Sequence, residues 1–213
     1  MKKQTMITIA ACVLAVAGSA TAQDSDGTNM PVVSSAPPGV EFTPMTRSER
    51  VREYVKGTFW PGSFVTAAAR AGIDQAFDRP KEWGGADGFG KRLGNVYGKH
   101  VIRQTLQFGA SAALHEDDRY LASGQKGFWS RTRYAIASTF LARRDNGDRC
   151  FALARMGGAA GSAFISRAWQ PASTSGMGSA ASSFGFTIAG DLGSNIVKEF
   201  WPDLKRRFRR NQP

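Results

Sequence analysis

The sequence predicts a mainly α-helical fold, a compact helical bundle whose helices pack closely through glycine and alanine. Three observations carry this prediction. Apolar residues recur at helical spacing over long stretches, and residues 89–114 show the strongest pattern. Helix start signals stand ahead of several of these stretches. Glycine and alanine recur four residues apart, which places them in one line along a helix.

The first helices are predicted from their start signals. Thr46 and Glu49 have the spacing of a capping box, in which each side chain bonds the other's free backbone amide. A single helical domain of residues 46–213 should begin there. Pro61 suits the first turn of a second helix, because the amide that proline lacks has no partner at that position. The predicted helices cover residues 46–57, 61–77, 89–114, 127–141, 152–169 and 177–199.

One region allows two structures. Asn146-Gly147 is a typical tight turn, and the residues on either side alternate loosely between apolar and polar. A short β-hairpin near residues 139–153 and a helix–loop–helix are equally compatible with this pattern.

The glycine pattern indicates how the helices meet. Gly90, Gly94 and Gly98 lie on one helix face, although each glycine costs about 1 kcal/mol in a helix relative to alanine. We therefore expect a neighbouring helix to approach this face closely. Gly157 and Gly161 repeat the spacing in a later helix, and small residues line the last helix in the same way. The same stripes could also build an oligomer or a pore.

Residues 1–22 have the three parts of a secretory signal peptide. Lys2 and Lys3 give a positive start, residues 6–17 an uncharged apolar stretch, and Ala20-Thr21-Ala22 a cleavage site. We expect cleavage after Ala22, which leaves 191 residues in the periplasm or at the outer surface of the envelope.

The segment after the signal and the cysteines complete this picture. Residues 23–45 are rich in Ser, Pro, Gly and Thr and predict a disordered linker. Cys12 ends a run that resembles a lipoprotein cleavage box, so lipidation is an alternative to cleavage after Ala22. Cys150 would be the single cysteine of the mature chain, which excludes an intramolecular disulfide and favours a structural thiol over a reactive one.

The charge balance points to acidic partners. Without the two signal lysines, Lys and Arg number 26 against 17 Asp and Glu, a net charge of about +9. A basic exported protein is suited to anionic lipid, lipopolysaccharide or an acidic envelope polymer, and extracellular nucleic acid is a less favoured alternative. A charge that serves solubility alone is an equal alternative, and a homo-oligomer stays open.

The densest polar cluster runs from His115 through Glu116, Asp117 and Asp118. Such a run suggests acid–base catalysis or metal binding, and His115, Glu116 and Asp118 are weak catalytic candidates. Consecutive residues of a helix point in different directions, however, and the other histidine, His100, lies about 22 Å away along a continuous helix. We therefore favour a structural helix end, and predict no metal site and no cofactor.

The C-terminal run combines bulky apolar groups with cations. Aromatic rings favour the membrane–water boundary, and cations favour anionic head groups. Phe200-Trp201-Pro202 resembles Phe59-Trp60-Pro61, so we expect a helix to end before Pro202 and a basic aromatic tail to follow. A solvated tail without a membrane role is the alternative. The membrane-surface candidates are Trp201, Lys205, Arg206, Arg207, Phe208, Arg209 and Arg210.

Four sequence runs carry a resemblance to a family of uncharacterised exported bacterial proteins. These runs are Gly88-Phe89-Gly90-Lys91-Arg92, His115-Glu116-Asp117-Asp118-Arg119-Tyr120, Gly127-Phe128-Trp129-Ser130-Arg131 and Lys198-Glu199-Phe200-Trp201-Pro202-Asp203. The resemblance covers roughly residues 50–207. It implies secretion and a shared helical fold, and it brings no catalytic residue.

These observations favour a non-enzymatic secreted protein of the cell envelope, periplasmic or peripherally bound to a membrane. Two alternatives stay open. One is a hydrolase or metal-dependent enzyme that uses the cluster at His115, and the other is an envelope oligomer or pore built on the glycine stripes.

Overall fold

A computed structural model of the chain describes residues 42–85 and 87–210, with only the backbone of residues 209 and 210. The predicted signal peptide, its cleavage site and lipidation box, and residues 23–41 of the predicted linker lie outside the described residues.

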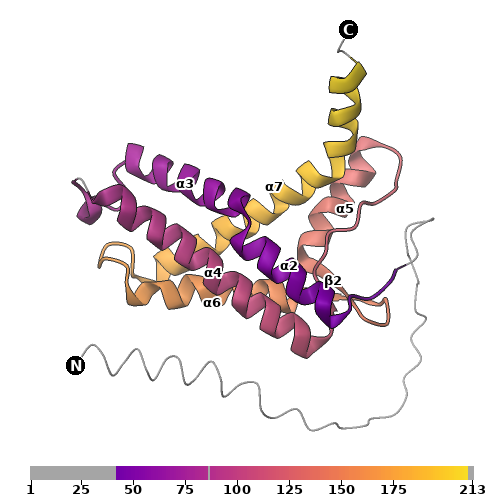
Figure 1. The fold of residues 1–213 in the computed structure, drawn as a ribbon, viewed down its shortest axis with the longest axis horizontal. Coiled ribbons are helices and arrows are strands. Elements are labelled where there is room, and N and C mark those ends of the chain that lie inside the picture. The colour runs from indigo at the N-terminus through magenta and orange to yellow at the C-terminus, as the bar shows by residue number, and fades with distance from the viewer. Residues whose placement is uncertain (1–41, 86, 211–213) are drawn as a thin grey trace. The chain divides into compact units, whose positions relative to one another are not determined.

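The described part is mainly helical, as predicted, with one small antiparallel sheet (Figure 1). Its elements in chain order are α2 (Arg47–Phe59), α3 (Pro61–Ala76), η1 (Lys81–Trp83), α4 (Gly88–Leu114), β1 (Glu116–Asp117), α5 (Phe128–Phe140), β2 (Leu141–Arg144), β3 (Arg149–Phe151), α6 (Leu153–Ile165), η2 (Ser166–Ala168) and α7 (Met177–Arg210).

The predicted start signals are confirmed. Thr46 caps α2, since its Oγ1 accepts from the Glu49 amide at 3.3 Å and its own amide donates to Glu49 Oε2 at 2.8 Å. Pro61 is the first residue of α3, and Trp60 lies between the two helices in an extended conformation. The predicted boundary between the first two helices is therefore correct.

The region near residues 139–153 forms the β-hairpin. β2 and β3 pair antiparallel with Ala142 opposite Cys150, and Gly147 occupies the turn with a positive φ of 88°. β1 adds a third strand that the sequence did not reveal, with Glu116 opposite Arg144. The sheet order is β1-β2-β3.

The close helix contact lies on a different glycine face from the one predicted. A Cβ added to Gly158 of α6 would lie 2.9 Å from the backbone oxygen of Arg103 in α4, and one added to Gly161 would lie 2.5 Å from Leu106 Cδ1. These glycines let α6 approach α4. The prediction is thus confirmed for Gly161, which was named, while Gly158 was missed.

The other glycines named for packing do not contact a neighbouring helix. A Cβ at Gly90, Gly94, Gly98 or Gly157 would meet no atom within 4 Å among the described residues. The prediction that a helix packs closely there is wrong within one copy of the chain, because α6 meets α4 on another face.

The described core is built from small side chains. Its buried apolar residues are Ala67, Ala71, Ala135, Ala142, Ala152, Ala154, Ala159, Ala163, Ala180 and Ile188.

α7 continues through Pro202 to Arg210, so the predicted helix end before Pro202 and the separate tail are wrong. Figure 1 shows that α7 changes direction toward its C-terminal end. Proline removes one helical hydrogen bond and crowds the preceding turn. Arg131 of α5 supports this turn from outside the helix, because its Nη2 donates to the backbone oxygen of Glu199.

A buried arginine holds the loop between α3 and α4. The Arg92 side chain is 1% exposed, and its Nε donates to the Arg79 carbonyl at 2.8 Å. Its two Nη atoms donate to the carbonyls of Trp83 at 2.9 Å and Pro80 at 3.1 Å, and to Asp78 Oδ1 at 2.8 Å. This single guanidinium thereby fixes the loop that contains η1.

Candidate functional site

The catalytic candidates of the histidine cluster do not form a common site. His115 is 75% exposed and contacts Asp145 through Nδ1 at 3.1 Å. Glu116 is 2% exposed, and its Oε2 accepts from the Ala154 amide in the first turn of α6 at 3.0 Å. Glu116 therefore caps a helix N-terminus, a position where a carboxylate is stabilising.

The two aspartates of the cluster are also bound to separate partners. Asp118 accepts from Gln107 Nε2 at 3.1 Å and lies 3.7 Å from Arg155. Burial raises the pKa of Asp118 despite the opposing effects of Arg155 and Gln107. Asp117 pairs with Arg119 at 2.6 Å. Within residues 42–85 and 87–210, no group of three metal-ligating side chains converges.

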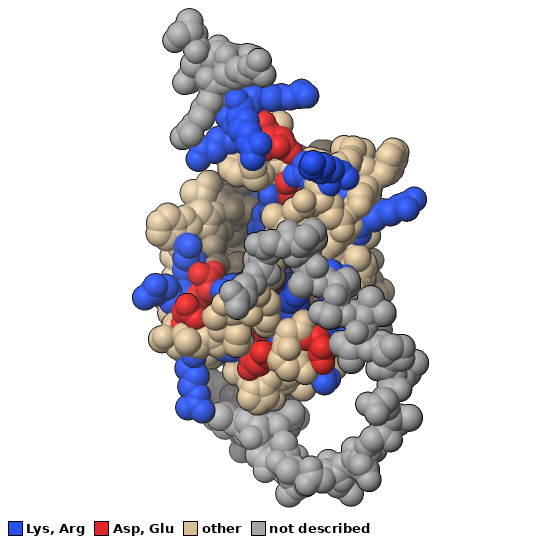
Figure 2. All heavy atoms as spheres, turned by 90° about the vertical axis from the view of Figure 1, so that its right-hand side faces the viewer, with Lys and Arg blue, Asp and Glu red and all other residues tan. Residues whose placement is uncertain are grey.

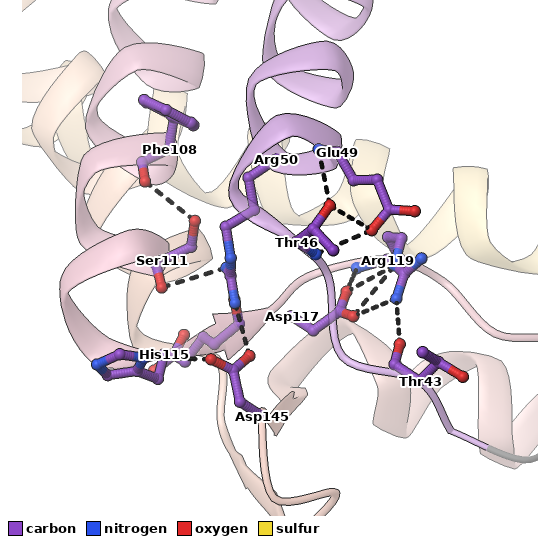
Figure 3. Close-up of polar contacts among 11 residues, drawn as sticks. Thr43, Thr46, Glu49, Arg50, Phe108, Ser111, His115, Asp117, Arg119 and Asp145 are labelled. Carbon is purple, nitrogen blue, oxygen red and sulfur yellow. Dashed lines mark hydrogen bonds and ion pairs between the residues drawn. The ribbon is translucent and has the colours of Figure 1, made fainter.

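Arg50 connects this polar cluster to α2 (Figure 3). Its guanidinium reaches from α2 to the end of α4, where it donates to the carbonyls of Ser111 at 3.4 Å and of Glu116. It also pairs with Asp145 at 2.7 Å. The cluster thus joins α2, α4, the sheet and α6, which agrees with the structural interpretation of its sequence.

A second buried network lies between α5 and α7. Glu199 of α7 is 1% exposed and accepts from Tyr120 Oη at 2.6 Å, from the Ser123 amide at 3.0 Å and from Ser123 Oγ at 2.5 Å. Arg131 Nε of α5 donates to it at 2.9 Å. Burial opposes ionisation of Glu199, but the hydrogen bonds from Ser123, Tyr120 and Arg131 outweigh it and lower its pKa.

Arg131 extends this network toward the end of α7. Its Nη1 contacts Asp203 Oδ2 at 2.5 Å, and its guanidinium lies 4.4 Å from the centre of the Phe200 ring. The Phe128 ring packs on Phe200 with centroids 5.3 Å apart. The start of α5 and the end of α7 are therefore fixed to each other by ionic and aromatic contacts together.

The opposite side of the α7 end is apolar and exposed. Trp201 is 57% exposed, Leu204 44% and Phe208 72%. With about 100° between successive helix residues, these three lie within about 60° of one another and roughly opposite Glu199. They form an apolar stripe on the face turned away from the buried network.

The start of α5 adds two more exposed rings. Gly127 precedes the helix with a positive φ of 96°, and Phe128 and Trp129 follow at once. Phe128 is 61% exposed and Trp129 72%, and their rings contact each other edge to face at 5.4 Å. Five large apolar side chains are thus exposed on two joined helix ends.

Cations accompany these apolar groups. Lys205, Arg206 and Arg207 of α7 and Lys126 before α5 are exposed. Within the described part of the chain, none of the four lies within 4 Å of a carboxylate. Figure 2 shows Lys and Arg gathered around the C-terminal end of α7. We call the following set, which lies around the end of α7 and the start of α5, the basic aromatic surface: Lys126, Phe128, Trp129, Trp201, Leu204, Lys205, Arg206, Arg207 and Phe208.

Part of this surface was predicted from the sequence. Trp201, Lys205, Arg206, Arg207 and Phe208 are exposed as expected, while the side chains of residues 209 and 210 are not described. Lys126, Phe128, Trp129 and Leu204 were missed. The adjacent Phe-Trp pair after a glycine was the available signal, but its proximity to α7 depends on tertiary structure.

Cys150 is half-buried in β3, and its Sγ lies 3.8 Å from the Ala142 carbonyl. Burial and the nearby Glu116 raise the pKa of the thiol. This environment disfavours the thiolate, which is the nucleophilic form.

The comparisons with known proteins found no family model, no curated protein and no solved structure that matches this chain. Among the described residues, no helix combines the length and the apolar character that crossing a membrane requires.

Proposed function

We propose that the chain is a non-enzymatic exported protein of the cell envelope that attaches peripherally to anionic membranes through the basic aromatic surface. The observation that carries this proposal is the exposure of Trp201, Phe208 and Trp129 beside exposed cations that have no described carboxylate within 4 Å. Amphipathic surfaces of this composition lie in the interfacial layer, with rings among the head groups and cations at the lipid charges.

The magnitudes require both kinds of side chain. Each basic residue close to an anionic surface contributes about 1 kcal/mol, so Lys205, Arg206 and Arg207 together supply about 3 kcal/mol. That alone corresponds to binding weaker than about 1 mM. The exposed rings must supply the remainder, and the ionic part should weaken as salt is added.

Vesicle co-sedimentation of the chain without residues 1–22 tests the proposal. A variant with Lys205, Arg206 and Arg207 all changed to Gln should lose most binding to vesicles that contain anionic lipid. Its matched control changes the exposed Arg47, Arg52 and Lys56 of α2 to Gln, which removes the same charge elsewhere.

The two components can be separated further. Trp201→Ala with Phe208→Ala should weaken binding at any salt concentration, whereas the loss in the triple Gln variant should shrink at high salt. Equal sedimentation with neutral and anionic vesicles would contradict electrostatic attachment. An equal loss of vesicle binding in the α7 variant and in its α2 control would contradict it as well.

The open glycine face favours a second candidate, self-association. Gly94 and Gly98 line a cleft of about 660 Å³ with Trp83 and Trp169 among its walls. A helix of a second copy could approach this face closely, because the glycines carry no side chain. Sedimentation velocity should show an oligomer that Gly94→Leu dissociates without changing the circular dichroism. A wild-type monomer at all concentrations would exclude it.

A further inference from the structure

A large cavity lies between α3, α4 and α7, away from the basic aromatic surface. Its volume of about 780 Å³ falls within the range of small-molecule sites. Arg70 and Asp74 line it from α3, Asn95 to Arg103 from α4, and Ser179 to Asp191 from α7. Arg79 and Trp83 border it from the loop that Arg92 holds.

Both acids of this cavity are already paired. Arg103 contacts Asp191 at 2.5 Å, and Arg70 lies 3.6 Å from Asp74. The Gly57 carbonyl accepts a hydrogen bond of 3.0 Å from His100 Nε2. Burial lowers the pKa of His100 despite that bond. The lining therefore holds its two carboxylates in local ion pairs.

Two cations of the lining, Lys99 and Arg79, have no carboxylate within 4 Å in the described part of the chain. The Lys99 ammonium donates to Ser183 Oγ at 2.5 Å. Burial and the nearby Arg70 lower the pKa of Lys99, and Asp74 opposes them in part. Arg70, Arg79, Lys99 and Arg103 outnumber Asp74 and Asp191 in the lining, so the cavity carries an excess of positive charge that an anion would balance.

Hydroxyl groups of α7 line the same cavity. Ser179, Ser182 and Ser183 have spacings that place them on one helix face, whereas the Thr187 hydroxyl already donates to the Ser183 carbonyl at 2.8 Å. α7 also begins at the cavity with no acidic residue in its first turn, so its positive end is not neutralised there. The lining thus combines serine hydroxyls with the Lys99 and Arg79 cations.

The geometry points to a binding site for a small organic phosphate, held by Lys99, Ser183 and the neighbouring α7 hydroxyls. A phosphate oxyanion accepts several hydrogen bonds at once, and lysine binds it as a point charge. The cavity leaves room beyond the phosphate for a polar organic group.

Isothermal titration with inorganic phosphate and with glycerol phosphate tests this assignment. Both should bind the wild-type chain, and glycerol phosphate should bind more tightly because it fills more of the cavity. Lys99→Met removes the charge and keeps most of the stem, so it should weaken binding at least about tenfold. Lys91→Met on the exposed part of α4 is the matched control and should bind like wild type.

Two further measurements keep the test decisive. Ser183→Ala should weaken binding less than Lys99→Met, and circular dichroism should show both variants folded. Vesicle binding should be unchanged in Lys99→Met, which separates this site from the basic aromatic surface. Equal binding of glycerol and glycerol phosphate, equal affinity in Lys99→Met and wild type, or no heat with either phosphate would overturn the assignment.

Discussion

Replacement of Glu199 by glutamine should strongly destabilise the chain, because this side chain joins α5, α7 and the loop before α5. Glutamine keeps the volume but loses the charge and places an amide donor among four donors. Tyr120, Ser123 and Arg131 currently direct those donors at the Glu199 carboxylate over 2.5–3.0 Å. At least two of these bonds should be lost.

The expected loss follows from these contacts. A hydrogen bond to a charged group contributes about 1.5–3 kcal/mol. Breaking a buried ion pair by removing one partner costs about 3–5 kcal/mol. Arg131 keeps Asp203, which limits the penalty to about 3–4 kcal/mol on the same scale. In a domain of this size, that corresponds to a fall of about 10 °C in Tm.

Urea unfolding followed by circular dichroism measures this loss. Glu53→Gln, an exposed charge on α2, is the control and should change the free energy of unfolding by less than about 0.5 kcal/mol. Tyr120→Phe should cost about 1 kcal/mol alone and add little in the Glu199→Gln background, since both remove the same bond. A loss below about 1 kcal/mol for Glu199→Gln would refute the assigned network.

The pH dependence of the difference between wild type and Glu199→Gln gives a second test of the network. The pKa of Glu199 is lower in the folded chain than its ordinary value. Its contribution to stability is therefore complete above the unfolded pKa of about 4.3 and is lost as the pH falls through the folded pKa. Wild type should lose its advantage over Glu199→Gln in that acidic window, and a constant difference down to the lowest pH would contradict the shift.

Three other substitutions or reactions test separate parts of the fold. Gly158→Ala should destabilise the fold by about 1–3 kcal/mol, because the added Cβ would push α6 away from α4. Gly94→Ala should stabilise the fold by about 0.5–1 kcal/mol, because a Cβ there meets no described atom. Thermal unfolding of the two variants distinguishes the packed glycine face from the open one. Arg92→Met should cost about 3 kcal/mol, measured by urea unfolding, because it leaves part-buried carbonyls of the α3–α4 loop without a donor. Cys150 should react with iodoacetamide more slowly in the folded than in the urea-unfolded chain, and equal rates would contradict its raised pKa.

Local signals in the sequence predicted the helices well. The Thr46 capping box and Pro61 place α2 and α3 within two residues, since both act on the adjacent backbone alone. Asn146-Gly147 allowed two structures, and the structure has the hairpin, with β1 paired to its first strand from a distance in the sequence. Local chemistry thus determines where α2 and α3 begin, but it did not decide between the two structures near Asn146.

Features that depend on a distant partner could not be predicted. Glycine spacing marked Gly94 and Gly161 equally, but only Gly161 meets a neighbouring helix. Pro202 suggested a helix end, whereas a side chain from α5 stabilises the turn around it. The sequence around Glu199 is rich in charged residues, and nothing in it indicated that this one carboxylate is buried.

The continuity of α7 changes how the basic aromatic surface should bind a membrane. A flexible tail must lose about 1–2 kcal/mol of backbone entropy for each residue that orders at the surface. Here Arg131 and Glu199 hold the helix, so Trp201 and Phe208 are aligned before contact. Glu199→Gln should therefore weaken vesicle binding even though residue 199 lies on the opposite face. Unchanged binding by a folded but destabilised Glu199→Gln variant would show that the surface acts without this alignment.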